Sequence, residues 1–231
     1  MTCPAPKPVP CFRADGTTFD LISPHPSEIS VETIAGPLSR INRFNGTSYA
    51  GYSVAQHCVM GAEALLNEGA EPIVAAFFLL HDAHEALLGD WTRPAQDAII
   101  ARMCVIANDS TTAIVFKNAM FSLKCDWDAA IYSAFDLPRP AIWTKADTAA
   151  VKRMDNMMLA AEARALFPLG HELYPLAKFP QPKLRGAITP WGAAKAEERF
   201  INLASQLIGQ DRIDAARLNH LAHISKPAKR R

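Results

Sequence analysis

The chain has 231 residues, of which 49% are hydrophobic and 20% charged, proportions typical of a folded globular protein rather than a disordered one. Basic and acidic residues nearly balance, 24 against 23, and four cations stand within the last six residues, so the rest of the chain is acidic overall. An acidic body argues against duplex nucleic acid as a partner. Only the basic sequence KPAKRR at residues 226–231 leaves binding of RNA or single-stranded DNA as an alternative.

Membrane insertion, secretion and a disulfide framework are disfavoured as well. The longest apolar run, residues 73–80, is far shorter than the roughly 20 residues that a membrane-spanning helix requires. The opening sequence MTCPAPKPVP lacks the apolar stretch of a signal peptide. The five cysteines are odd in number and show no CxxC spacing, a pattern typical of reduced thiols and not of a zinc finger. We therefore expect a cytoplasmic protein without membrane contacts.

The N-terminal region differs in pattern from the rest of the chain. It begins with a proline-rich stretch, and two β-prone stretches then flank Asp15-Gly16, a dipeptide that favours a hairpin turn. Helical patterns follow. We expect a Pro-rich segment with a hairpin at residues 1–26, a main domain at 27–210, and a C-terminal helix with a basic tail at 211–231.

Apolar residues recur at helical spacing through the main domain, and capping residues mark several helix ends. Ser53 is a suitable N-cap, Pro72 stands at a first helical position, and Gly89 is expected to end a helix. The expected helices cover residues 32–44, 53–67, 71–89, 94–108, 111–123, 127–135, 144–166 and 189–208. The sequence thus predicts an all-α fold with a small N-terminal β-hairpin.

Three of these helices carry a histidine or a carboxylate on the stripe that should face the core. The residues are His57 in the first helix, His81 with Glu85 in the second, and Asp147 in the third. A charged group buried without a partner is costly. The two imidazoles and the carboxylates of Asp82 and Asp147 would avoid that cost by sharing one metal ion, with positions left open for water and substrate. The alternative, in which each group is satisfied separately in the core, stays open on this pattern alone.

Six segments of the chain resemble a known family: FDLISPHPSEI, PLSRINRFNG, YSVAQHCV, LLHDAHEALLGDWTRP, KADTAAVKRMDNMMLAAEARAL and PWGAAKAEERFINL. Together they are similar to the HD-domain metal-dependent phosphohydrolases, above all to 5′-deoxynucleotidases and to phage dATP triphosphohydrolases. The similarity extends over about residues 19–208. Its most specific part is HDAHEALLGD, with a QH pair upstream and a helical Lys-Ala-Asp downstream. The resemblance implies an HD-domain helical bundle.

The resemblance also implies roles for particular residues. Glu85 matches the family's catalytic glutamate, and its spacing of four from His81 puts both on one helix face. Asp90 matches a second functional acid. The implied ligands of one divalent ion, Co²⁺, Mn²⁺ or Zn²⁺, are His57, His81, Asp82 and Asp147.

Four further residues are candidates for binding the nucleotide: Arg43, Phe44, Thr92 and Pro94. Arg43 matches an arginine that contacts the phosphate in the family. Phe44 stands where the family often has a tryptophan near the nucleoside. Thr92 and Pro94 follow the HD motif closely in the sequence and would line the base pocket.

The sequence departs from the family at two places. Ala95-Gln96 stand where the family has a phosphate-contacting lysine, which leaves the number and position of the phosphates open. Arg93 or Lys145 would be a substitute. Members with two metal ions carry additional histidines after the HD pair, whereas here His84 alone lies between that pair and the last predicted ligand, so one ion is expected.

We expect an enzyme that uses a divalent metal ion to hydrolyse deoxynucleotides, first of all a 5′-nucleotidase that releases phosphate from deoxynucleoside monophosphates. One alternative is a triphosphohydrolase that releases tripolyphosphate from dNTPs such as dATP. The other is a non-catalytic nucleotide-binding protein on the same scaffold. The expected partners are the nucleotide and, because relatives are often dimers or larger, further copies of the chain.

Overall fold

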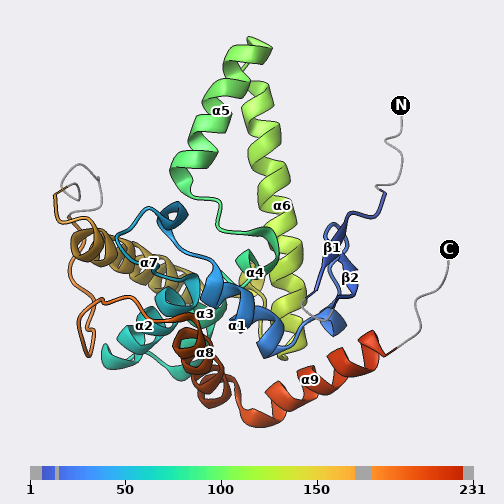
Figure 1. Ribbon diagram of the computed structural model, residues 1–231, viewed down its shortest axis with the longest axis vertical. Helices are drawn as coiled ribbons and strands as arrows, with labels where there is room; N and C mark the ends of the chain where they lie inside the picture. The colour runs from blue at the N-terminus through green and yellow to red at the C-terminus, as the bar shows by residue number, and fades with distance from the viewer. Residues whose placement is uncertain (1–6, 14–15, 170–177, 226–231) are drawn as a thin grey trace.

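The computed structural model describes residues 7–13, 16–169 and 178–225 and confirms an all-α fold with a small hairpin near the N-terminus (Figure 1). The strands are β1 (Pro10–Phe12) and β2 (Thr18–Asp20), and single 3₁₀ turns lie at η1 (Pro26–Glu28), η2 (Phe44–Gly46) and η3 (Pro140–Ile142). The helices are α1 (Val31–Arg40), α2 (Val54–Asn67), α3 (Pro72–Leu80), α4 (Glu85–Leu88), α5 (Arg93–Ala107), α6 (Thr111–Ala134), α7 (Lys145–Leu166), α8 (Ala193–Ile208) and α9 (Gln210–Ile224). The first prolines of the N-terminal segment, Asp15 of the expected turn and the basic tail at 226–231 lie outside the described residues.

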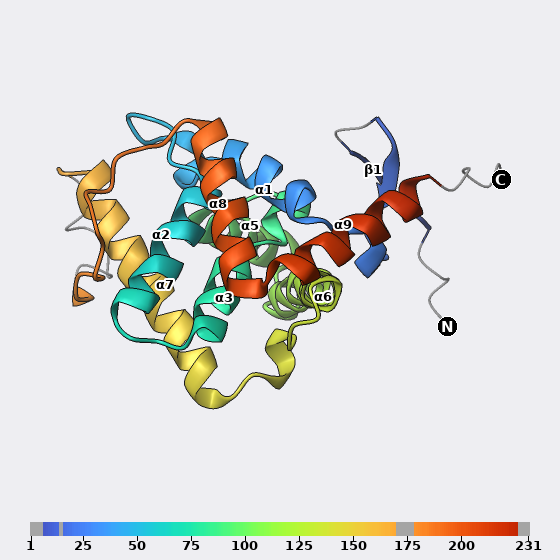
Figure 2. The same cartoon turned by 90° about the horizontal axis from the view of Figure 1, so that it is seen from below.

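Helices α2 and α3 form the centre of the core, where α2 packs against α1, α3, α7 and α8 (Figure 2). The side chains of α3 are buried from Val74 to Leu80, and those of α2 are buried from Val54 to Ala62. Such burial on every side is typical of a helix enclosed by other elements. A polar residue within either of these buried stretches is therefore shut off from water and needs a partner inside the protein.

The hairpin and the C-terminal helix pack on this same core. In the antiparallel register Cys11 faces Phe19, whose ring meets that of Trp127 edge to face at a centroid distance of 5.6 Å. Helix α9 packs against η1 and contributes Ile213 and Ala216 to the hydrophobic cluster. The expected segments 1–26 and 211–231 thus add buried side chains to the core of segment 27–210.

The first helix ends earlier than predicted. Helix α1 begins after Ser30, which forms a capping box with Thr33, and it ends at Arg40 rather than at residue 44. The chain leaves the helix there because its next residues pair with the segment before α2: the Arg43 N–H donates to the Tyr52 carbonyl at 2.8 Å. This short antiparallel pairing fixes the backbone of Arg43 beside the start of α2.

The predicted helix at residues 71–89 is broken in the middle. Helix α3 ends at Leu80, turns follow, and α4 is a separate helix that ends at Gly89 with a φ of +80°. Neither glycine nor proline marks this break in the sequence. After the break, ligand atoms of Asp82, His84 and Glu85 all lie within 4.8 Å of one another.

The last predicted helix begins later than expected. Its N-cap is Gly192, not Thr189, although Thr189-Pro190 is a good start signal in sequence. The buried side chain of Gln56 explains the difference, because its Nε2 donates to the Thr189 carbonyl and its Oε1 accepts from the Trp191 N–H, both at 2.8 Å. These bonds hold residues 189–191 outside the helix. The cap predicted at Ser53 is confirmed, and Thr144 caps the helix that was expected from residue 144.

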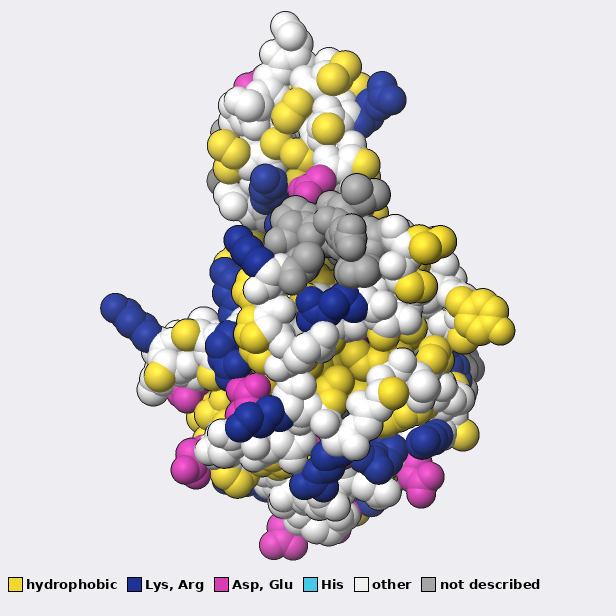
Figure 3. Space-filling view, turned by 90° about the vertical axis from the view of Figure 1, so that its left-hand side faces the viewer, with side chains coloured by type: hydrophobic (Ala, Val, Ile, Leu, Met, Phe, Trp, Pro, Cys, Tyr) yellow, Lys and Arg dark blue, Asp and Glu magenta, His cyan; other side chains and the backbone are white. Residues whose placement is uncertain are grey.

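Helix α5 and the first half of α6 form an arm that projects from the body, and the two expected helices at 111–123 and 127–135 are one continuous helix, α6 (Figure 1). Hydrophobic side chains gather on the outside of this arm (Figure 3), where Val105, Ile106 and Phe121 are at least 69% exposed. Only the second half of α6 packs in the core, so the apolar residues of this helix do not follow one stripe along its whole length. None of the described helices is long and apolar enough to cross a membrane.

Gly61 allows α2 and α3 to approach each other, since a Cβ there would lie 2.1 Å from Cε1 of Phe78. We predict that Gly61→Ala lowers the free energy of unfolding by about 1–3 kcal/mol, because the fully buried Phe78 has little room to move. Chemical denaturation measures the effect. Gly186→Ala is the control, since nothing lies within 4 Å of its added Cβ. Equal stability of the two variants would contradict this description of the helix contact.

Candidate metal centre

His57 is fully buried and His81 is largely buried, and each ring is oriented by a bond through Nδ1. His57, on α2, has Nδ1 2.6 Å from Oε1 of Glu162, and His81, at the end of α3, has Nδ1 2.6 Å from the Phe78 carbonyl oxygen. Because a carbonyl oxygen only accepts, Nδ1 of His81 carries the hydrogen, and the carboxylate of Glu162 favours the same arrangement in His57. In the neutral imidazoles the lone pair then lies on Nε2.

Both Nε2 atoms point at two carboxylates. Nε2 of His81 is 3.1 Å from Oδ2 of Asp82 and 3.8 Å from Oδ1 of Asp155. Nε2 of His57 is 3.4 Å from the same oxygen of Asp155 and 3.9 Å from Oδ2 of Asp82. Both Nε2 atoms are buried and make no hydrogen bond. His57, His81 and Asp155 form a group that could hold a metal ion, and Oδ2 of Asp82 adjoins it through its contacts with both Nε2 atoms.

The charges around this cluster favour a cation. Burial lowers the pKa of His81, but Asp82 and Asp155 outweigh burial and hold that pKa well above its usual value. Burial raises the pKa of Asp82, yet the neighbouring histidine lowers it further than burial raises it. Asp155 has a lowered pKa for the same reason. The excess of negative charge at this point is neutralised either by protons on the imidazoles or by a bound metal ion.

Behind the cluster, Glu162 connects His57 to Arg43. Glu162, on α7, is fully buried, and its Oε2 accepts a bond from Nε of Arg43 at 3.0 Å while its Oε1 faces His57. Nη1 of Arg43 lies 3.6 Å from Asp82. Burial lowers the pKa of Arg43, but Glu162 and Asp82 raise it above its usual value, so the guanidinium stays charged. One carboxylate therefore positions both a candidate ligand and the predicted phosphate-binding cation.

The prediction of Asp147 as the fourth ligand is wrong, and Asp155 occupies that place. Oδ2 of Asp147 accepts a hydrogen bond of 2.6 Å from Oγ1 of Thr144, in the capping box that begins α7. Asp155 lies eight residues further, roughly 12 Å along the helix axis. The signal that identifies it is present in the sequence: Val151, Asp155, Met158 and Glu162 follow each other at steps of four, three and four and so share one face.

The two predicted catalytic acids lie beside the cluster. Glu85 begins α4 with a buried carboxylate whose Oε2 makes no hydrogen bond. Burial raises its pKa well above the usual value, and the nearby charges of Asp82 and Asp90 raise it further. Asp90 follows Gly89, and burial raises its pKa too. Their assignment as catalytic residues stays a prediction.

The residues predicted to contact the nucleotide lie in two parts of the chain, at η2 and at the start of α5. Phe44 adopts a φ of +57°, which is rare for a residue with a side chain, and its ring lies 5.2 Å from that of Phe167. The guanidinium of Arg43 lies 5.7 Å above the Phe44 ring. Thr92 is the N-cap of α5, and Pro94 stands in its exposed first turn. Substrate binding by these residues stays a prediction.

Two other groups of side chains overlap this cluster. Cys58 comes close to His81 and Asp82, but burial raises the pKa of the thiol to about 11, which disfavours the thiolate that a metal ion needs. The second group consists of Asp82, His84 and Glu85, whose ligand atoms also lie close together. Sequence analysis identified His57, His81 and Asp82 but missed Asp155 and Glu162.

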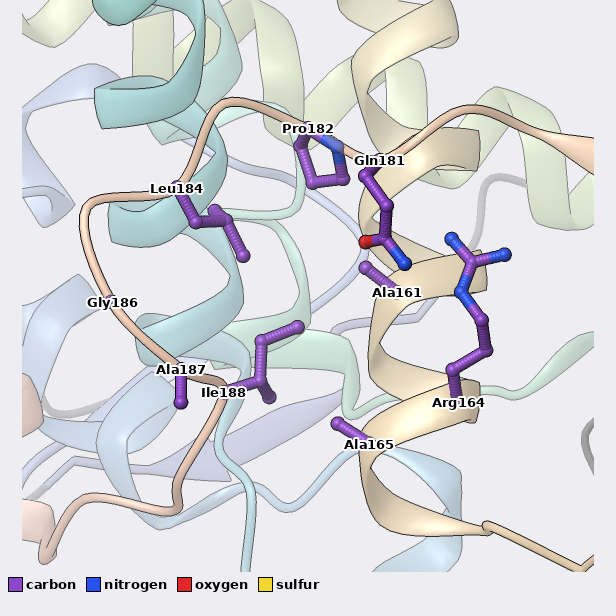
Figure 4. A pocket seen from close by; sticks show the side chains of 9 residues that line it. All are labelled: Ala161, Arg164, Ala165, Gln181, Pro182, Leu184, Gly186, Ala187 and Ile188. Carbon is purple, nitrogen blue, oxygen red and sulfur yellow. The ribbon is translucent and has the colours of Figure 1, made fainter.

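A surface hollow lies elsewhere on the molecule. It has a volume of about 380 Å³ and lies between α7 and the segment at residues 181–188 (Figure 4). Its lining contains Arg164, whose guanidinium lies toward the Gln181 side chain, but none of the ten predicted site residues. The hollow is therefore not the candidate centre.

Comparisons with known proteins leave the family open. No family model matches the chain. An uncharacterized protein of Rhodobacter capsulatus is 38% identical over 104 residues, which are 43% of this chain and 53% of that protein. The chain thus matches about half the length of this curated relative, whose description states no activity.

We predict that Asp155→Asn weakens binding of Mn²⁺ more than tenfold, because it removes a carboxylate from the cluster, whereas Asp147→Asn leaves the affinity unchanged. Calorimetric titration of metal-free protein measures both. The pair is matched, since each change replaces one oxygen on the same helix. Loss of affinity in Asp147→Asn alone would restore the residue expected from the sequence and contradict the geometry found here.

Removing Glu162 is expected to destabilise the metal-free protein. We predict that Glu162→Ala lowers the free energy of unfolding by about 3–5 kcal/mol, because it leaves the buried Arg43 charge without its partner. The control is Glu197→Ala, which removes an ion pair of 3.4 Å between half-exposed side chains and should cost less than about 1 kcal/mol. Denaturation in the presence of a chelator compares the two. Similar losses in both variants would show that the Glu162 bridge adds nothing beyond a surface pair.

Proposed function

We propose that this protein is a divalent-metal-dependent phosphohydrolase of the HD-domain type that acts on deoxynucleotides. The observation that carries the proposal is the convergence of His57, His81, Asp82 and Asp155, with the Nε2 atoms of both histidines buried and free of hydrogen bonds. The sequence HDAHEALLGD, which contains His81 and Asp82 of this cluster, also supports the proposal. The mixed nitrogen and oxygen ligands suit Mn²⁺, Co²⁺ or Zn²⁺ better than Ca²⁺.

A divalent ion bound at these residues supplies a Lewis acid for a phosphoryl oxygen and lowers the pKa of a water molecule. The chain itself provides the groups that move protons. Burial raises the pKa values of Glu85 and Asp90 above their usual values, which favours the protonated forms and suits these residues to give a proton to a leaving oxygen or to accept one from water. Their position next to Asp82 puts them at the edge of the cluster.

Arg43 provides the positive charge for the phosphate. Glu162 holds its Nε, so the guanidinium is fixed before substrate binds, with Nη1 on the side of Asp82. A preorganised cation costs little reorganisation when negative charge develops on phosphoryl oxygens. In this proposal Phe44, whose ring lies beneath the Arg43 guanidinium, contacts the nucleoside. The simplest substrate for one fixed arginine is a monophosphate, which favours a 5′-nucleotidase.

Product analysis tests the proposal. We predict that protein loaded with Mn²⁺ or Co²⁺ releases orthophosphate from dAMP, and that a chelator abolishes the release. Ion chromatography separates orthophosphate from tripolyphosphate. Release of tripolyphosphate from dATP, without hydrolysis of dAMP, would replace the nucleotidase by a triphosphohydrolase. Binding of nucleotide with no product from either substrate would make the protein a non-catalytic binder.

Loss of the buried carboxylate at position 85 should abolish turnover. We predict that Glu85→Gln lowers kcat by about 10²–10⁴ while the protein still folds, because the amide cannot carry a proton. The matched control is Glu198→Gln on the exposed face of α8, which should keep the wild-type kcat. Steady-state kinetics with dAMP and circular dichroism of both variants provide the comparison. Unchanged turnover in Glu85→Gln would remove this residue from the reaction.

A further inference from the structure

A second group of buried polar atoms lies beside the first cluster. His84 is 6% exposed and Glu85 is 7% exposed. Nε2 of His84 and Oε2 of Glu85 are both buried without a hydrogen-bond partner, although more than nine in ten buried polar groups in proteins have one. A ligand atom from each residue and one from Asp82 all lie within 4.8 Å of one another. The proton transfer argued above does not require His84.

His84 is oriented in the same way as the two histidines of the first cluster. Its Nδ1 lies 2.9 Å from Oδ1 of Asp128, on α6. A carboxylate acceptor at this distance favours the hydrogen on Nδ1, which leaves the Nε2 lone pair free. Histidines that bind metal ions commonly have such a carboxylate behind the ring. Asp128 therefore prepares His84 as a ligand rather than as a donor to Glu85.

We propose that Asp82, His84 and Glu85 form a second divalent-cation site, which shares Asp82 with the first. This inference rests on the proposed function, because it takes the first cluster to be a metal site. Ligand atoms about 2.1 Å from one ion are at most about 4.2 Å apart, so the three atoms need only a small inward movement. Asp82 has two carboxylate oxygens and can serve both ions.

The second site leaves the proposed proton transfer to the same two acids. Glu85 offers one carboxylate oxygen to the second cation, and its other oxygen can still exchange a proton with water, as can Asp90. Two adjacent cations also fit a phosphoester substrate, because the attacking and the leaving oxygen both bear negative charge during hydrolysis. The sequence expectation of a single ion is thereby replaced by a pair.

Counting bound ions tests the second site. The full chain is loaded with Mn²⁺ and desalted, and the manganese is measured by mass spectrometry. We expect two ions in the wild type, one in His84→Ala, and two in the control His220→Ala, which removes a buried histidine bonded to the Ser27 carbonyl. Two ions retained in His84→Ala would overturn the proposal. A single ion in the wild type that disappears in Asp155→Asn would overturn the second site and leave the first intact, whereas no bound ion at all would overturn both.

Electron paramagnetic resonance of the wild type gives a measurement that does not depend on any variant. Two Mn²⁺ ions that share Asp82 should give an exchange-coupled spectrum, and two distant ions should give separate six-line signals. Uncoupled signals from protein with two ions would place the second ion elsewhere and overturn the proposal. We also expect Asp128→Asn to weaken the second binding event about tenfold and to leave the first unchanged. Equal affinities in that variant and the wild type would contradict the role given to Asp128.

Discussion

The candidate centre depends on one constraint: two imidazoles buried in an apolar core are fixed so that their free nitrogens face carboxylates. Glu162 and the Phe78 carbonyl each occupy one nitrogen of a ring, and the remaining nitrogen of each faces Asp82 and Asp155. Burying this much charge is unfavourable unless a cation balances it. Helices α2, α3 and α7 pack against one another and bring these groups to one point.

The same constraint connects the core to the surface of the site. Close contact between α2 and α3 at Gly61 presses Phe78 into the core, and the carbonyl of that residue then orients His81. The pairing after α1 brings Arg43 to Glu162, which already binds His57. The packing of α2 on α3, the orientation of the two histidine rings and the position of the Arg43 charge are therefore linked through shared residues.

Much of this arrangement could be predicted from the sequence. His57 and His81 stand on the apolar stripes of their helices, and Asp82 is adjacent to one of them. Helical periodicity defines the face of a helix but not the height at which a neighbour crosses it. The fourth ligand was therefore predicted at Asp147, which lies roughly two turns before Asp155 and about 80° away from it around the axis of α7.

Other features depend on long-range contacts that no local pattern reveals. The break after α3 has no glycine or proline to mark it, and the late start of α8 results from the side chain of Gln56, more than 130 residues earlier in the chain. Glu162 looks like an ordinary helix residue until its partners on α2 and after α1 are known. Caps at Ser53 and Thr144 were predictable because their bonds lie within one helical turn.

The most direct test of the centre is an anomalous-difference map from crystals of the protein loaded with Mn²⁺ or Co²⁺. The arrangement predicts a peak about 2.0–2.2 Å from Nε2 of both His57 and His81, with oxygens of Asp82 and Asp155 completing the ligands. A peak bound to Asp147 instead, or an ion-free cluster in which the imidazoles donate directly to Asp82 and Asp155, would contradict it.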